Sequence, residues 1–301
     1  MTTTAPVARR LDVGSASVAY CDSGGDGPPL LLLHGCPFSK FVWRNVIPRL
    51  SEHFRCVAPD LLGLGDTETP AGADWSLPAQ ADAIIGLLDR LGLARVAIVG
   101  HDQGGAIAQL IAIHHPGRVS ALVLADAEAY DNWPSAEELP FIRVTQLPVI
   151  GPLVLWAWSR RPLFRWALGE GKAVYDRSVL TNDLVDGYIA ANLATAHKRA
   201  KTRRFLATQL DPANQAHTHH LADALHKIEV PTLILWGEGD VHFPPVWARR
   251  LAADIPGTTR VETLPATGHL LMEEQPDHIA SLIREFLTTT TRSGPKDAPR
   301  C

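Results

Sequence analysis

One segment constrains the fold of this chain most: a short apolar run, followed by a glycine-rich turn and an apolar helical pattern. Val96–Val99 is typical of a strand buried in a parallel sheet. It leads through Gly100-His101-Asp102-Gln103-Gly104-Gly105 into the helical run Ala106–Ile113. Glycines two residues before and after Asp102 let neighbouring backbones approach closely around a sharp turn. The segment therefore predicts a strand, a turn that projects Asp102 above a sheet, and a helix whose N-terminus favours its negative charge.

The same alternation of short apolar runs and helical patterns recurs along the chain. Ser76 is suited to cap a helix with one apolar face, and Pro276 is suited to open another. Strands alternating with helices imply right-handed crossovers and a doubly wound, mostly parallel sheet of the α/β class. Four further runs, bounded by turn residues, fit buried strands: Leu30–Leu33, Cys56–Ala58, Ala121–Ala125 and Thr232–Trp236.

The alternation stops between Tyr130 and Leu221, where the sequence is mostly helical in pattern, including a continuous run over Asn182–Leu206. A helical insertion between two strands predicts a lid over the carboxyl ends of the strands, where open α/β sheets bind ligands. The polar C-terminal sequence predicts a flexible tail. We therefore expect a core formed by residues 1–129 and 222–288, a helical cap over 130–221 and a tail over 289–301.

The composition limits the kinds of partner. Lys and Arg number 28 against 32 Asp and Glu, a net charge of −4 that offers nucleic acid no basic surface. The four cysteines lack C-x-x-C spacing, so they indicate neither a zinc site nor a disulfide framework. No apolar segment reaches the about 20 residues that span a bilayer. We expect a cytoplasmic protein without metal or cofactor that acts on a small molecule and water and contacts no membrane; its oligomeric state stays open.

Two further residues follow the turn at Asp102 in an informative order. Asp240 comes directly after the Thr232–Trp236 run in LILWGEGD, and His269 lies in LPATGHLLMEEQP. The chain also carries His-Gly-Cys-Pro at 34–37 and Asp-Leu-Leu-Gly-Leu-Gly at 60–65. In this order of nucleophile, acid and histidine, the sequence resembles the α/β-hydrolase family over roughly residues 10–130 and 225–287.

The resemblance implies an α/β-hydrolase fold and a triad of Asp102, Asp240 and His269. It also implies that the backbone N–H groups of Cys36 and Gln103 form an oxyanion hole. Asp126 and Glu128 follow the strand before the cap, a position that some members use for the acid, so both remain alternatives to Asp240.

An aspartate at the nucleophile position resembles the epoxide hydrolases, haloalkane dehalogenases and fluoroacetate dehalogenases of this fold. A carboxylate is already ionised and can displace a leaving group from a saturated carbon, which yields an alkyl-enzyme ester. His269, oriented by Asp240, would then activate water to attack the carbonyl carbon of Asp102. The resemblance therefore implies a hydrolase that works in two chemical steps.

The leaving group is less clearly indicated. Dehalogenases usually carry a Trp directly after the nucleophile and an Asn or second Trp elsewhere as halide donors, whereas this chain has Gln103 and Cys36. Fluoroacetate dehalogenases carry a basic residue where Gln103 stands. Epoxide hydrolases need a lid Tyr or His that protonates the epoxide oxygen, and this chain offers three tyrosines in or beside the cap: Tyr130, Tyr175 and Tyr188.

We therefore favour an epoxide hydrolase-like enzyme that acts on a small apolar substrate. A haloalkane dehalogenase whose halide donors come from cap tryptophans is the alternative of the same class. A non-catalytic ligand-binding protein of this fold is the alternative of another class. The side chains expected to contact the substrate are His34, Tyr130, Trp133, Trp156 and Tyr188.

Overall fold

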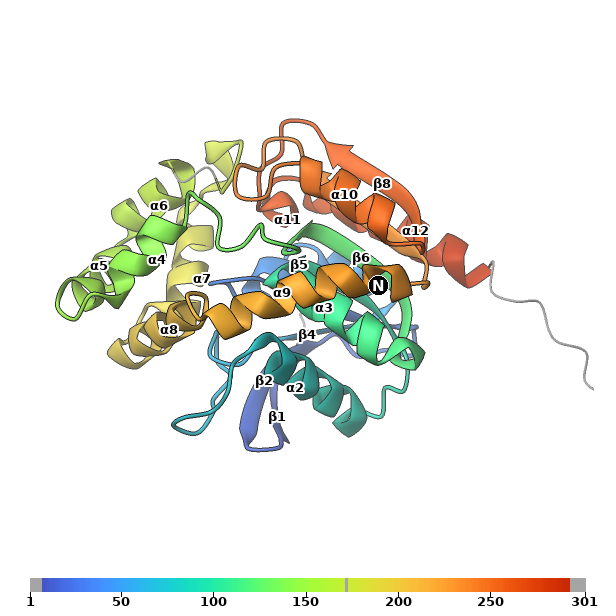
Figure 1. The fold of residues 1–301 in the computed structure, drawn as a ribbon, viewed down its shortest axis with the longest axis horizontal. Coiled ribbons are helices and arrows are strands. Elements are labelled where there is room, and N and C mark those ends of the chain that lie inside the picture. The colour runs from blue at the N-terminus through green and yellow to red at the C-terminus, as the bar shows by residue number, and fades with distance from the viewer. Residues whose placement is uncertain (1–6, 171–172, 293–301) are drawn as a thin grey trace, which may run out of the picture.

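Eight strands form one sheet in the computed structural model, which describes residues 7–170 and 173–292 (Figure 1). Across the sheet the order is β1-β2-β4-β3-β5-β6-β7-β8; β2 is antiparallel to β1 and β4, and all other neighbours are parallel. This mostly parallel sheet confirms the predicted fold class. The strands are β1 (Val7–Val13), β2 (Ala16–Asp22), β3 (Pro29–Leu33), β4 (Arg55–Pro59), β5 (Val96–Asp102), β6 (Val119–Ala127), β7 (Thr232–Gly237) and β8 (Thr258–Leu264).

The five predicted strands correspond to the central strands of the sheet, from β4 to β7. The sequence does not predict β1, β2 or β8. In β8 the side chains alternate between half-buried and exposed, and β1 includes Arg9 and Arg10. Strands at or near an edge bury less apolar surface than central strands, so their sequences lack a continuous apolar run.

Both helices that the sequence predicts outside the cap are present in the structure. Ser76 caps α2, where its hydroxyl accepts a hydrogen bond from the Ala79 N–H at 3.4 Å. Pro276 opens α12, which continues to Arg292, so residues 289–292 of the predicted flexible tail are helical. Threonine hydroxyls there bond to carbonyls one turn back, which satisfies them within the helix. The rest of the predicted tail, 293–301, lies outside the described residues.

The α-helices outside the cap and the 3-10 turns of the described residues have the following bounds. The α-helices are α1 (Ile47–Leu50), α2 (Leu77–Arg90), α3 (Gln103–His114), α10 (Val246–Asp254), α11 (Leu271–Glu274) and α12 (Pro276–Arg292). Short 3-10 turns are η1 (Lys40–Trp43), η2 (Pro116–Arg118), η3 (Arg177–Val179) and η4 (Leu225–Lys227).

Six helices lie between β6 and β7, as the break in the alternation predicts: α4 (Leu139–Gln146), α5 (Ile150–Trp158), α6 (Arg161–Glu170), α7 (Asn182–Asn192), α8 (Ala196–Thr208) and α9 (Pro212–Ala224). The run predicted over 182–206 is two helices, because the Thr195 hydroxyl caps α8 by accepting from the Lys198 N–H at 3.1 Å. Helices α4 to α8 gather at one end of the molecule, whereas α9 crosses back over α3 (Figure 1).

The centre of the sheet is dry and closely packed. Every residue of β5 and of β7 is buried, and Leu31, Leu32 and Leu33 of β3 have no exposed surface. A core packed to this density leaves the ends of its strands little freedom to move. It therefore fixes the places at which the chain leaves β3, β5 and β7, and the candidate site lies there.

Candidate active site

Asp102 occupies the turn between β5 and α3. Its backbone has a φ of 54°, a strained conformation for a residue other than glycine. A Cβ on Gly104 would lie 2.5 Å from the Leu33 carbonyl oxygen, so only glycine permits this approach of the helix to β3. The Oδ1 atom of Asp102 accepts a hydrogen bond from the Cys36 N–H at 2.9 Å and another from the Gln103 N–H. The two predicted oxyanion-hole amides thus meet at one oxygen of this carboxylate.

His269 joins Asp102 to Asp240. Its Nε2 lies 3.1 Å from Asp102 Oδ2, and its Nδ1 lies 2.9 Å from Asp240 Oδ2. The other Asp240 oxygen accepts from the backbone N–H groups of His242 at 2.8 Å and Phe243 at 3.0 Å, which fixes the carboxylate toward the imidazole. All three side chains of the predicted triad are buried and in contact.

The charges of this arrangement are mutually dependent. Burial opposes ionisation of Asp102, but the hydrogen bond and charge of His269 lower the pKa of that carboxyl below its ordinary value. Burial also opposes protonation of His269, but Asp240 and Asp102 raise its pKa well above the ordinary histidine value. Contact between the two groups therefore favours the protonated form of His269 and the ionised form of Asp102.

The two alternative acids are held differently. Asp126 Oδ1 accepts from the Gly237 N–H at 2.9 Å, and its Oδ2 has no partner among the described residues. Burial, followed by the negative charge of Asp240, raises the pKa of Asp126 well above its usual value. Burial and the charge of Asp102 do the same for Glu128. The structure thus brings Asp240 to His269, whereas Asp126 and Glu128 are buried carboxyls whose environment favours the neutral form.

One group of side chains in the described part of the chain has the proximity of metal ligands. Nitrogen or oxygen atoms of His101, Asp126 and His269 lie within 4.8 Å of one another. Both ring nitrogens of His269 already face carboxylates, and His101 Nε2 bonds to the His269 carbonyl at 3.0 Å. His269 therefore has no free nitrogen for a cation, and only His101 Nδ1 and Asp126 Oδ2 are unpartnered among the described residues of this group, so the group offers fewer ligands than a metal site needs.

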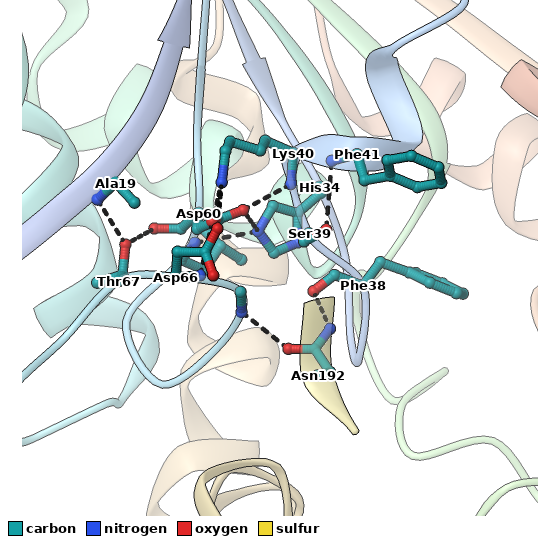
Figure 2. Close-up of polar contacts among 12 residues, drawn as sticks. Ala19, His34, Phe38, Ser39, Lys40, Phe41, Asp60, Asp66, Thr67 and Asn192 are labelled. Atoms are coloured by element: carbon teal, nitrogen blue, oxygen red, sulfur yellow. Dashed lines mark hydrogen bonds and ion pairs between the residues drawn. The ribbon is translucent and has the colours of Figure 1, made fainter. Parts of the chain in front are cut away.

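The loop that supplies the Cys36 amide is braced by Asp60 (Figure 2). Asp60 Oδ1 accepts from the Lys40 N–H at 2.7 Å, and its Oδ2 accepts from Lys40 Nζ at 2.5 Å and from the Asp66 N–H at 2.8 Å. Asn192 of α7 adds a connection to the cap: its Nδ2 donates to the carbonyls of Pro37 and Phe38, each at 2.8 Å. These bonds hold the loop after β3 in place.

A cavity of about 510 Å³ opens beside the triad. Asp102 does not line it, but Cys36 and His269 do, and both bond to the Asp102 carboxylate. Most of the remaining lining is apolar and comes from the loop after β3 and from the cap: Pro37, Phe38, Trp133, Phe141, Ile142, Trp158, Phe164, Trp166, Leu168 and Leu206. Such a cavity suits a small apolar ligand.

Comparisons with known proteins identify the family of this chain. The profile of the Alpha/beta hydrolase family matches residues 30–281. The chain belongs to this family. Haloalkane dehalogenase 2 of Mycobacterium bovis is 32% identical over 283 residues, which cover 92% of this hydrolase and 93% of that protein. The uncharacterized hydrolase YugF of Bacillus subtilis is 28% identical and covers 93% of this chain and 97% of its own.

A solved structure has the same fold. Haloalkane dehalogenase DbeA from Bradyrhizobium elkani USDA94 superposes with a TM-score of 0.80 at 24% identity, over 96% of this chain and 99% of that one. The similarity to other hydrolases indicates an enzyme, so the hypothesis of a non-catalytic binding protein is set aside.

Of the five side chains expected to contact substrate, only Trp133 lines the cavity of this hydrolase. Its indole N–H donates to Gln209 Oε1 at 2.7 Å. Trp156 is 49% exposed on the outer surface of α5. His34 lies within the bracing network of Figure 2, where its Nδ1 donates to the Gly35 carbonyl and its Nε2 accepts from the Leu61 N–H.

None of the three tyrosines considered as proton donors lines the cavity either. The Tyr130 hydroxyl donates to Asp254 Oδ2 at 2.8 Å, and the Tyr188 hydroxyl donates to Glu273 Oε1 at 2.6 Å. Tyr175 is 62% exposed. A tyrosine's position in the cap does not determine which way its hydroxyl faces, because packing decides that direction.

The sequence does not single out Glu138 and His242, which both line the cavity. Burial and then the negative charge of Asp102 raise the pKa of Glu138 to about 8. Its Oε1 lies 3.5 Å from His242 Nδ1, and burial followed by the charge of His269 lowers the pKa of that histidine. The only local signal was Ser135, three residues earlier, whose hydroxyl bonds to Glu138 as in a capping box.

Replacing Gly35 with alanine is expected to lower turnover by about 100-fold or more, because about 1 Å of misplacement at a reacting group has that effect. A Cβ on Gly35 would lie 2.2 Å from the Asp102 Cβ and 2.3 Å from its Oδ1. Steady-state rates and thermal melting would be compared with Gly117→Ala, where a Cβ meets nothing within 4 Å. Turnover by folded Gly35→Ala within a few-fold of the parent would contradict this close contact.

Proposed function

We propose that this hydrolase opens the epoxide of a small apolar substrate through an alkyl-enzyme ester on Asp102. The observation that carries the proposal is Glu138, a carboxyl that lines the cavity beside Cys36 and His269 and whose pKa is raised to about 8. Below that pH Glu138 is a neutral acid next to an ionised nucleophile. A pair of carboxyl groups held in opposite protonation states is a common basis for acid and nucleophile roles.

In the first step, Asp102 Oδ2 attacks a ring carbon of the epoxide and forms an ester bond. The ring C–O bond breaks with its electron pair on oxygen, and Glu138 gives that oxygen its proton. Asp102 Oδ1 stays bonded to the Cys36 and Gln103 amides, which leaves Oδ2 as the attacking atom. Proton donation of this kind contributes about 10²–10⁴-fold to a rate.

In the second step, ester formation removes one of the negative charges that raise the pKa of His269. His269 then returns its proton to the Glu138 carboxylate, which lines the same cavity. Neutral His269 accepts a proton from water as the water oxygen attacks Cγ of Asp102. The oxyanion forms on Oδ1, where each amide donor contributes about 3–4 kcal/mol.

The tetrahedral intermediate collapses by breaking the bond from Cγ to the alkyl oxygen. That oxygen leaves as the second hydroxyl of a diol and takes a proton from His269. The carboxyl group left on Asp102 then loses its proton to His269, which restores the resting charges. Asp240 stays bonded to Nδ1 throughout and stabilises the imidazolium whenever it forms.

The acid favours an epoxide over a halide as substrate. A halide ion is a weak base and leaves without a proton, whereas an alkoxide is a strong base and needs one. The Gln103 amide, which stands where a dehalogenase would have a halide donor, bonds to Gln209 Oε1 at 2.9 Å. Residue 36 offers only a thiol side chain, a weak donor.

Haloalkane hydrolysis is the second candidate, because relatives that are 32% identical carry that name. The cavity also holds Trp158, whose indole N–H is the candidate halide donor, whereas the Trp133 N–H already donates to Gln209 Oε1. An Asp102 ester would form in both reactions, but an epoxide keeps its ring oxygen in that ester as a hydroxyl, whereas a haloalkane loses its halide. A panel of epoxides and haloalkanes, with diol formation and halide release measured separately, decides between them.

Glu138→Gln is expected to lower kcat for epoxides by about 10²–10³-fold, because glutamine has no proton to give. In the parent, activity should fall as the pH rises through about 8, where Glu138 loses its proton. The variant should lack this alkaline decline. Glu137→Gln is the matched control, since Glu137 is the exposed neighbour that also lines the cavity. Haloalkane turnover that is unchanged in Glu138→Gln, without diol formation from any epoxide by the parent, would instead support dehalogenation.

A further inference from the structure

The outer end of the cap exposes an unusual amount of apolar surface. Eight of the eleven large apolar side chains exposed on the described residues lie between Val144 and Trp166. Val149 is 72% exposed, Leu153 is 59% exposed and Trp156 is 49% exposed. Monomeric proteins rarely gather exposed apolar residues in this way unless the surface meets another apolar phase or partner.

The local structure explains why these side chains face outward. Leu153 and Trp156 are three residues apart on α5, whereas Gly151 and Leu155 on its other face are buried. Helices α4 and α5 meet at 120°, so the apolar segment 147–150 forms the tip where they join. In Figure 1 this tip is the end of the molecule farthest from α12. We call this region, residues 144–156, the cap tip.

No single helix among the described residues is long and apolar enough to cross a membrane, although α4 and α5 together reach that length and composition as a bent pair. Their exposed residues form a surface and not a continuous span. The predicted absence of membrane contact rests on the lack of a long apolar segment in the sequence. An apolar surface formed by separate short helices needs no such segment.

Basic residues of α8 lie beside the cap tip. This helix packs against α5 and carries five Lys or Arg residues, of which Lys198 and Lys201 pair with Asp66 and Glu68. The guanidinium of Arg199 donates to the Leu193 carbonyl at 2.8 Å, and that of Arg203 donates to the Thr145 carbonyl at 2.7 Å. These bonds go to neutral carbonyl oxygens, so no carboxylate of the described residues neutralises the charge of either arginine.

Apolar and basic groups meet in one groove. A hollow of about 440 Å³ has Leu153 and Trp156 of α5 on its lining together with Arg199 and Arg203 of α8. Arg160 follows the end of α5, and its guanidinium lies over the Trp156 ring, 4.4 Å from the ring centroid. Aromatic and aliphatic side chains bordered by arginine match the boundary between acyl chains and anionic headgroups.

We propose that the cap tip docks onto an anionic lipid surface. A second copy of the chain fits less well, because a two-fold contact would bring the same unneutralised arginines face to face. On a lipid surface those arginines would meet phosphate groups while Val149 and Leu153 enter the acyl region. This proposal does not depend on the chemistry at Asp102.

Helix α6, which packs against α5 of the cap tip, contributes exposed residues to the cavity lining. Trp166 of α6 is 64% exposed and also lines the cavity. Glu170, at the end of the same helix, is exposed and lines it as well. An apolar substrate dissolved in a membrane would therefore meet the enzyme close to the cavity entrance.

Co-flotation with vesicles of pure phosphatidylglycerol or pure phosphatidylcholine tests the proposal. The parent should float with phosphatidylglycerol, bind phosphatidylcholine at least ten-fold more weakly, and lose binding as salt rises. Arg160→Gln, which removes the charge over the Trp156 ring, should weaken binding to phosphatidylglycerol about five-fold. The apolar double variant Val149→Ser/Leu153→Ser should weaken it more than ten-fold.

Val246→Ser/Val261→Ser is the matched control, because Val246 and Val261 are exposed apolar residues of the core. It should bind vesicles as the parent does, and all variants should keep the parent's melting temperature and its turnover of water-soluble substrates. Failure of the parent to float with phosphatidylglycerol, or equal binding to both lipids, would overturn the proposal. A dimer that light scattering detects and that Val149→Ser/Leu153→Ser abolishes, without vesicle binding, would assign the cap tip to self-association and also overturn it.

Discussion

His269→Gln is expected to stop turnover after the first step and to leave the substrate attached to Asp102. Glutamine has no group that accepts a proton from water, whereas the Oδ2 that attacks the substrate remains. The two backbone amides still hold Oδ1, because they belong to Cys36 and Gln103. Loss of a general base lowers a rate by about 10²–10⁴-fold, so the ester should accumulate.

Intact-mass spectrometry of the variant measures this directly and also identifies the leaving group. An epoxide adds its whole mass to the protein, whereas a haloalkane adds its mass less that of the hydrogen halide. The double variant His269→Gln/Asp102→Ala is the control and should show no adduct. A folded His269→Gln variant that hydrolyses substrate at the parent's rate would contradict the role of His269.

The second large effect is expected for Asp240→Asn, with a loss of about 10³–10⁴-fold in turnover. The Asp240 carboxylate lies 2.9 Å from His269 Nδ1, and its charge contributes most to raising the pKa of His269. An asparagine there removes that charge and can present its amide N–H to the ring. The imidazolium of the second step would then form without its counter-charge.

Asp126→Asn is the matched comparison. Burial and the charge of Asp240 raise the pKa of Asp126 well above its usual value, and its Oδ1 accepts a hydrogen bond from the Gly237 N–H. An asparagine oxygen can accept the same hydrogen bond. Turnover should therefore stay within about ten-fold of the parent's, a difference that corresponds to about the net free energy of one hydrogen bond. Rates and melting temperatures of both variants would be measured together. A larger loss for Asp126→Asn than for Asp240→Asn would reverse the assignment of the acid.

Much of the core was predictable because its signals are local. The turn around Asp102 needs glycines at fixed positions, and a fully buried strand such as β7 needs a continuous apolar run. The chain order of Asp102, Asp240 and His269 is typical of the α/β-hydrolase family and can be recognised without knowledge of the rest of the sequence. The edge strands β1 and β8 escaped prediction because half-exposed strands tolerate charged residues.

The cap was predictable as helical but not in its contacts. Tyr130 and Tyr188 lie in the expected segment, yet their hydroxyls bond to Asp254 and Glu273, away from the cavity lining. Glu138, which we propose as the proton donor, has no distinguishing spacing in the sequence. Its pKa is raised by burial and by the charge of Asp102, and both arise only in the folded chain. Directions of side chains and proximity across the chain come from tertiary packing.

The amide of Asn192 has a consequence for how substrates enter. It joins helix α7 to the loop after β3 and to the loop after β4. Its Nδ2 donates to the carbonyls of Pro37 and Phe38, and its Oδ1 accepts from the Gly65 N–H at 2.8 Å. Swinging α7 outward would break all three bonds and release the segment that carries the Cys36 amide. We therefore expect substrates to enter and products to leave through a permanently open entrance near Trp166. The size of this entrance would then limit which substrates reach the cavity.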